Sequence, residues 1–136
     1  MTAHSPLAPV PVAWRHFTVA QANRAVPYVR RIVEDIGEVY RDAVGLQKRL
    51  EYPLPDQDPA ELEARYERRM SRLRQLVAEL EDVGVELKDY DKGLVDFPAV
   101  HQGREVYLCW KLGEPAIAAW HEVEDGYAGR RDLDEL

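Results

Sequence analysis

The stretch LVDFPAVHQGREVYLCWK, residues 94–111, decides the fold of this 136-residue chain. Apolar side chains alternate through its two halves, and His101-Gln102-Gly103-Arg104 separates them. The pattern is typical of two antiparallel strands joined by a tight turn, in which Gly103 can adopt a positive φ. A turn centred on residues 102 and 103 would pair Asp96 with Cys109, Pro98 with Tyr107, Val95 with Trp110 and Phe97 with Leu108. Because side chains alternate between the faces of a sheet, the first two pairs would share one face and the last two the other.

Two long amphipathic segments precede this hairpin. In the first, apolar residues recur every seven positions from Ala22 to Leu50, and Thr18 with Gln21 fits a capping box at its start. The second begins with Asp58-Pro59, a favourable N-cap followed by a favourable first helical residue. The proline-rich loop between them is short. We therefore expect an antiparallel helical hairpin over residues 18–88.

The residues after Lys111 extend the predicted sheet. Leu112-Gly113-Glu114-Pro115 turns the chain, and residues 117–123 fit either a strand or a short helix. We favour a strand, which gives a three-stranded β module over residues 94–123. Pro98 lacks a backbone N–H, so its strand is expected to lie at an edge or to carry a bulge. The expected fold class is α+β: a long antiparallel helical hairpin packed on a small antiparallel β-meander.

The length suits a single domain, which we expect over residues 17–130. Residues 1–16 begin with a stretch rich in Pro, Ala and Ser and fit a disordered leader. Residues 131–136 are expected to form an acidic tail.

Composition favours a cytoplasmic protein that binds neither nucleic acid nor membranes. The net charge is −7, which disfavours generic binding to phosphate-rich surfaces. No stretch approaches the roughly 18 apolar residues that a spanning helix needs. The lone cysteine, Cys109, cannot form an internal disulfide, which favours a reducing compartment. An arginine cluster at residues 65–74 is interspersed with glutamates, and we interpret it as a solvated helix face.

Familiar catalytic and metal-binding motifs are absent from the sequence, but four scattered residues could form a site. Asp96, Cys109, Glu114 and His121 are all competent ligands for zinc or another divalent transition metal. A second hypothesis is nucleophilic catalysis by Cys109 with His121 as its base. The structural alternative makes Cys109 a small hydrophobe and Asp96 and His121 hydrogen-bonded structural residues.

Two tryptophans, Trp110 and Trp120, could belong to a ligand-binding surface or to the core. Aromatic residues are enriched at binding sites, but they also build the cores of small modules. Core packing is the preferred interpretation for Trp110, and both roles stay open for Trp120.

The sequence also resembles a known family. The resemblance is carried by the following segments: Phe17 to Asn23, Gly84 to Asp89, Gly93 to Pro98, Val106 to Trp110, Gly113 to Pro115, Trp120-His121 and Gly126 to Arg130. In this order they resemble the uncharacterised bacterial family called domain of unknown function 2203. The resemblance implies no particular activity. It does imply that Asp96, Cys109, Trp110, Glu114, His121 and Arg130 belong to the family pattern, and we treat them with Trp120 as candidate binding residues.

These observations favour a non-enzymatic binding or assembly module. The apolar seam of the two helices is long compared with the β module available to cover it, so we expect a homodimer formed through the helices. An unidentified protein partner is a further expectation. The alternative is a metal- or thiol-dependent site, hydrolase-like or metal-binding, built from the four residues named above.

Overall fold

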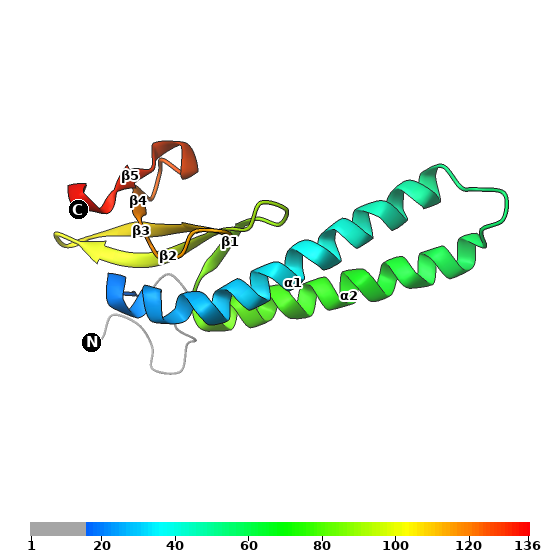
Figure 1. Cartoon of the computed structure of the whole chain (residues 1–136), viewed down its shortest axis with the longest axis horizontal. Helices are drawn as coiled ribbons and strands as arrows, with labels where there is room; N and C mark the ends of the chain where they lie inside the picture. Colours follow the sequence, from blue (N-terminus) through cyan, green and yellow to red (C-terminus); the bar gives the residue numbers. More distant parts are fainter. Residues whose placement is uncertain (1–15) are drawn as a thin grey trace, which may run out of the picture.

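The computed structural model describes residues 16–136, and it has the expected α+β architecture (Figure 1). Two helices, α1 (Val19–Glu51) and α2 (Pro59–Val83), pack against each other as an antiparallel hairpin. Five strands follow: β1 (Glu86–Asp89), β2 (Leu94–His101), β3 (Arg104–Lys111), β4 (Ala119–Glu122) and β5 (Arg131–Asp132). Two short 3-10 helices, η2 (Tyr127–Gly129) and η3 (Leu133–Glu135), flank β5. The predicted leader lies outside the described residues except for His16, whose Nε2 lies 3.0 Å from Glu105 Oε2.

Local sequence signals determine where the helices begin and end. The Thr18 hydroxyl accepts a hydrogen bond from the Gln21 backbone, and the Gln21 side chain accepts one from the Thr18 backbone, so the capping box is present. Asp58 caps α2 by accepting from the Ala60 backbone. Gly84 ends α2 in the left-handed conformation, with a φ of 101°. The helical hairpin therefore ends at Val83 and not near residue 88 as expected.

The strands form one antiparallel sheet in the order β1-β2-β3-β4-β5. The predicted register of the central hairpin is confirmed, including Asp96 opposite Cys109 and Phe97 opposite Leu108. The preference for a strand over a helix near residue 120 is also confirmed. Two edge strands were missed. β1 falls in the segment assigned to the second helix, and β5 lies in the expected acidic tail, where Arg131 pairs with Trp120.

Pro98 is accommodated in β2 because β1 does not extend far enough to pair with it. The β1 partners on β2 end at Asp96, and beyond that point the outer edge of β2 is open. The Pro98 carbonyl points to this outer side and accepts a hydrogen bond from the Phe17 backbone at 2.7 Å. The backbone nitrogen of a strand residue points the same way as its carbonyl, so the missing N–H of Pro98 breaks no bond to β3. β2 is thus not an edge strand as expected, because β1 pairs with its first residues, but Pro98 lies on the part of β2 that β1 does not cover.

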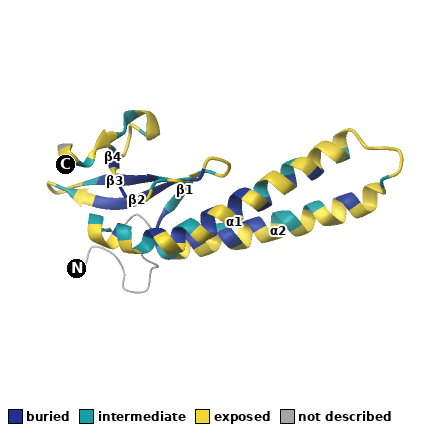
Figure 2. Ribbon diagram, viewed as in Figure 1, coloured by how far each residue is buried: buried dark blue, intermediate teal, exposed yellow. Residues whose placement is uncertain are grey.

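The hydrophobic core lies where one face of the sheet packs on the basal part of the helical hairpin (Figures 1 and 2). Val95, Phe97, Leu108 and Trp110 are buried on this face. The rest of the hairpin extends beyond the sheet, and there α1 and α2 bury apolar residues such as Leu46 and Leu62. Neither described helix has a segment apolar and long enough to span a membrane.

Asn23 on α1 connects the helices to the start of β4. Its side-chain oxygen accepts a hydrogen bond from the Ile117 backbone at 2.7 Å, and Ile117 is buried in the core. This contact fixes the chain just before the strand that carries His121.

Replacing Asn23 by alanine should lower the free energy of unfolding by about 1–3 kcal/mol, because the buried N–H of Ile117 would lose its acceptor. Urea denaturation followed by circular dichroism measures the loss. Asn23→Asp keeps an acceptor at this position and should lose clearly less; equal losses in the two variants would contradict a role for this hydrogen bond.

Candidate functional site

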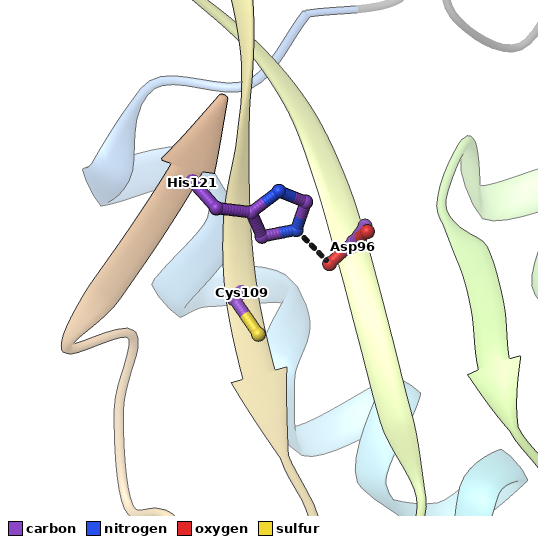
Figure 3. Close-up of side chains that lie close together, drawn as sticks. All are labelled: Asp96, Cys109 and His121. Carbon is purple, nitrogen blue, oxygen red and sulfur yellow. Dashed lines mark hydrogen bonds and ion pairs between the residues drawn. The ribbon is translucent and has the colours of Figure 1, made fainter. Parts of the chain in front are cut away.

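Three adjacent strands bring Asp96, Cys109 and His121 together on the sheet face that points away from the helices. Asp96 lies on β2, Cys109 opposite it on β3, and His121 on β4. His121 reaches across β3 to Asp96 (Figure 3). One potential ligand atom from each residue lies within 4.8 Å of the other two, and all three residues are buried. The alternation that places Phe97 and Leu108 in the core therefore also places Asp96 and Cys109 in this cluster.

The hydrogen bonds of His121 determine which ring nitrogen faces the cluster. Nδ1 lies 2.7 Å from the Glu122 carbonyl oxygen, and a carbonyl can only accept, so Nδ1 carries a hydrogen. Nε2 lies 3.0 Å from Asp96 Oδ1. One proton is therefore shared between Nε2 and the Asp96 carboxyl group. Burial opposes protonation of His121, but the bonds to Asp96 and the Glu122 carbonyl outweigh it and raise the pKa of the imidazole.

The surroundings of Cys109 do not suit a free thiolate. Burial, followed by the nearby Asp96 carboxylate, raises the pKa of the thiol to about 12. A nucleophilic cysteine needs a lowered pKa and a base directed at its sulfur. Both ring nitrogens of His121 are already engaged, with Asp96 and with the Glu122 carbonyl. The geometry therefore gives little support to the thiol-catalysis hypothesis.

Glu114 does not join the cluster. Its carboxylate accepts two hydrogen bonds from Arg130 Nη2, at 2.9 and 2.8 Å, and one from the Lys111 backbone at 2.8 Å. Arg130 in turn lies close enough to Cys109 that its positive charge lowers the thiol pKa against the larger effect of burial. Its Nε–H is buried and has no hydrogen-bond partner among the described residues. The predicted set of four ligands is thus a cluster of three, with Glu114 holding an arginine next to the sulfur.

The two tryptophans are core residues. Trp110 is fully buried and donates its indole N–H to the Glu114 carbonyl. Trp120 is also buried, donates to the Asp132 carbonyl, and is covered by the Arg131 guanidinium. Both belong to the hydrophobic core, which accounts for their positions without a ligand.

A cavity of about 310 Å³ adjoins the cluster. It is lined by Asp96, Cys109, His121, Lys88, Leu94, Tyr107, Val123, Gly126 and Tyr127. Its volume is in the range of small-molecule sites. Lys88 was not predicted as a site residue, because the sequence analysis assigns its segment to the second helix. Gly84, which ends α2, was the available signal that the helix stops before Lys88.

Tyr107 connects this cavity to β1. Its hydroxyl donates a hydrogen bond to Glu86 Oε2 at 2.6 Å, and Lys88 Nζ lies 3.1 Å from Glu86 Oε1. Partial burial raises the pKa of Glu86, but the bonds from Tyr107 and Lys88 outweigh it, so the pKa lies below its ordinary value. The pKa of Tyr107 is raised by burial and by the Glu86 carboxylate.

The fold and the cluster together define a small α+β protein with a buried Asp–Cys–His group on the outer face of its sheet. The chain belongs to the family described as "Uncharacterized conserved protein (DUF2203)", which matches residues 15–133. Comparisons with curated proteins and with solved structures gave no match. The expected family resemblance is confirmed, and the function has to be inferred from the site itself.

Tyr107→Phe should lower the free energy of unfolding by about 1 kcal/mol at neutral pH, because it removes a hydrogen bond to a charged carboxylate. The pKa of Glu86 is lower in the folded than in the unfolded chain, so its contribution is present above about pH 4.3 and is lost as the pH falls through the folded value. The difference between variant and wild type should therefore shrink in acid, as measured by urea denaturation across pH. Tyr90→Phe, at an exposed tyrosine, is the control; a pH-independent difference for Tyr107→Phe would contradict the assignment.

Proposed function

We propose that the protein binds one divalent transition metal ion, such as zinc, through Asp96, Cys109 and His121. The observation that carries the proposal is the convergence of a carboxylate, a thiol and an imidazole nitrogen within 4.8 Å in a buried cluster. Thiolate, imidazole and carboxylate are the three side-chain ligand types of zinc in proteins.

The orientation of His121 supports a metal rather than a purely structural role. Metal-binding histidines usually donate their second ring N–H to a carbonyl or carboxylate, which fixes the ring and directs the other nitrogen at the ion. The Glu122 carbonyl does this for Nδ1, and Nε2 faces Asp96. A metal ion would take the place of the proton between Nε2 and Oδ1.

The distances also suit a tetrahedral ion after small side-chain movements. Bonds of about 2.0–2.3 Å at the tetrahedral angle separate ligand atoms by roughly 3.3–3.7 Å. The His121 and Asp96 atoms are 3.0 Å apart, and all three lie within 4.8 Å. Burial and the Asp96 charge, which disfavour a thiolate at Cys109 without a cation, would be offset by the ion.

Three protein ligands would leave a fourth position for water or a ligand, which is the usual arrangement in catalytic zinc sites. The adjoining cavity of about 310 Å³ provides the space for it. A metal-dependent reaction such as hydrolysis would take place at this position. Purely structural zinc sites, by contrast, usually have four protein ligands.

The expected homodimer is not needed to bury the helical seam. Rows of apolar residues on α1 and α2 are already buried within one chain, among them Ile36 and Leu76 at the base and Leu46 and Leu62 further out. Dimer formation through the helices, a protein partner and a cytoplasmic location stay predictions.

Native mass spectrometry with elemental analysis should find one transition-metal ion per chain after expression with zinc. Cys109→Ser and His121→Gln should each lose stoichiometric metal, because removing one of three ligands leaves too few donors. The same spectra report the number of chains in the particle.

His16→Gln is the matched control, because it removes a histidine that lies outside the cluster. It should retain the metal. A folded, metal-free wild type in zinc-containing buffer would contradict the proposal, and so would equal metal content in the control and the cluster variants.

Arg130 is expected to support the metal site from outside the ligand set. A guanidinium beside the sulfur, held by Glu114, can donate to a metal-bound thiolate. Arg130→Gln should therefore weaken metal affinity about tenfold or more without abolishing binding, as measured by competition with a chromophoric chelator. Arg131→Gln removes the neighbouring arginine and should leave affinity unchanged; an unchanged affinity in Arg130→Gln would contradict the assigned role.

A further inference from the structure

The far end of the helical hairpin contains a second hollow, remote from the sheet. A cavity of about 470 Å³ lies between the last turns of α1 and the first turns of α2. Leu46 and Leu62 line its apolar part, and an adjoining cavity of about 330 Å³ shares Asp42, Leu46 and Arg65 with it. Figure 1 shows the two helices diverging toward the connecting loop in this region. We call this region, lined by the residues of the two cavities, the helix fork.

The helix fork is strongly positive in a chain of net charge −7. Six cationic side chains line its two cavities: Arg41, Lys48, Arg49, Arg65, Arg68 and Arg69. Asp42 is the one carboxylate that lines either of them. A third, smaller cavity on the loop side has acidic residues, including Asp58 and Glu61.

Most of these cations are not neutralised within the chain. Arg41 lies 3.4 Å from Asp91, and Arg69 lies 3.8 Å from Asp42. Lys48, Arg49, Arg65 and Arg68 have no ion pair or side-chain hydrogen bond within residues 16–136. The dipole of α1 favours cations at its C-terminal end and so accounts for Lys48 and Arg49. It does not account for the two arginines on α2.

Two further residues line the larger cavity. Gln57 lines the larger cavity, and its side-chain Oε1 is buried without a hydrogen-bond partner. Gly45 also lines this cavity from within α1, where a glycine costs about 0.5–1 kcal/mol relative to alanine. A Cβ at this position would meet no atom within 4 Å, so packing within the chain does not require the glycine. A longer side chain at this position would therefore extend into the open space of the fork.

We propose that the helix fork binds a small molecule with two or more linked phosphate groups. Four unpaired cations exceed the charge of one phosphate, and the cavity is larger than a single phosphate ion. The arginines offer paired donors to phosphate oxygens. Nucleotides and inorganic polyphosphates share this phosphate chemistry. The site is independent of the metal site on the sheet.

Isothermal titration calorimetry with ATP and, separately, with inorganic triphosphate tests the proposal on the full-length protein. Saturable binding with one ligand per chain is expected, and its affinity should fall as salt increases. Tighter binding of ATP would identify a nucleotide-like ligand, and equal binding would identify the phosphate chain as the recognised part. Absence of saturable binding of both probes at low salt would overturn the proposal.

Variants locate the site. The double substitution R49Q/R65Q should reduce affinity at least about tenfold. Gly45→Met should reduce it as well by filling the cavity without removing any charge, and a Cβ at this position meets no atom within 4 Å. Arg72→Gln removes an exposed arginine of α2 that lines neither cavity, and it should bind like the wild type.

An equal loss per removed charge in R72Q and R49Q/R65Q would show general electrostatic attraction and overturn the proposal. Cys109→Ser should bind the probes normally. Loss of probe binding in Cys109→Ser would place the binding at the sheet and overturn the helix-fork site. Loss of the metal with unchanged probe binding would bear only on the proposed metal function.

Discussion

The register of the β2–β3 hairpin is the constraint on which the rest of the structure depends. Side chains alternate along a strand, so the pairing that puts Phe97 and Leu108 against the helices also puts Asp96 and Cys109 on the outer face. A shift by one residue would exchange the two sets, exposing the core residues and burying the polar ones against the helices. The same packing that stabilises the fold thus positions the candidate site.

The buried polar groups on the outer face of the sheet would lower the stability of the fold if they had no function. Asp96 and His121 are buried, and a buried ion pair recovers its desolvation cost only with good geometry and further hydrogen bonds. The Glu122 carbonyl supplies one such bond and fixes the ring, so the pair is rigid and directed. Apolar residues of similar size could fill this space at lower cost. The proposed metal ion would account for a carboxylate, a thiol and an imidazole in one buried cluster.

Much of this arrangement could be predicted from the sequence, because it depends on short-range signals. The alternation around Gly103 predicts the register, and Thr18 and Asp58 predict where the two helices begin. The edge strands β1 and β5 could not be predicted in this way. They have four and two residues, too few for a periodic pattern, and they exist because a neighbouring strand offers unpaired backbone groups. The same holds for Glu114, whose role depends on the position of Arg130, sixteen residues away.

X-ray absorption spectroscopy at the zinc edge of the zinc-loaded protein tests the metal site most directly. The account predicts one sulfur ligand at about 2.3 Å and nitrogen or oxygen ligands at about 2.0–2.1 Å, with histidine scattering in the outer shell. A spectrum with nitrogen and oxygen ligands alone would show that Cys109 does not bind the ion, and it would contradict the proposed metal site.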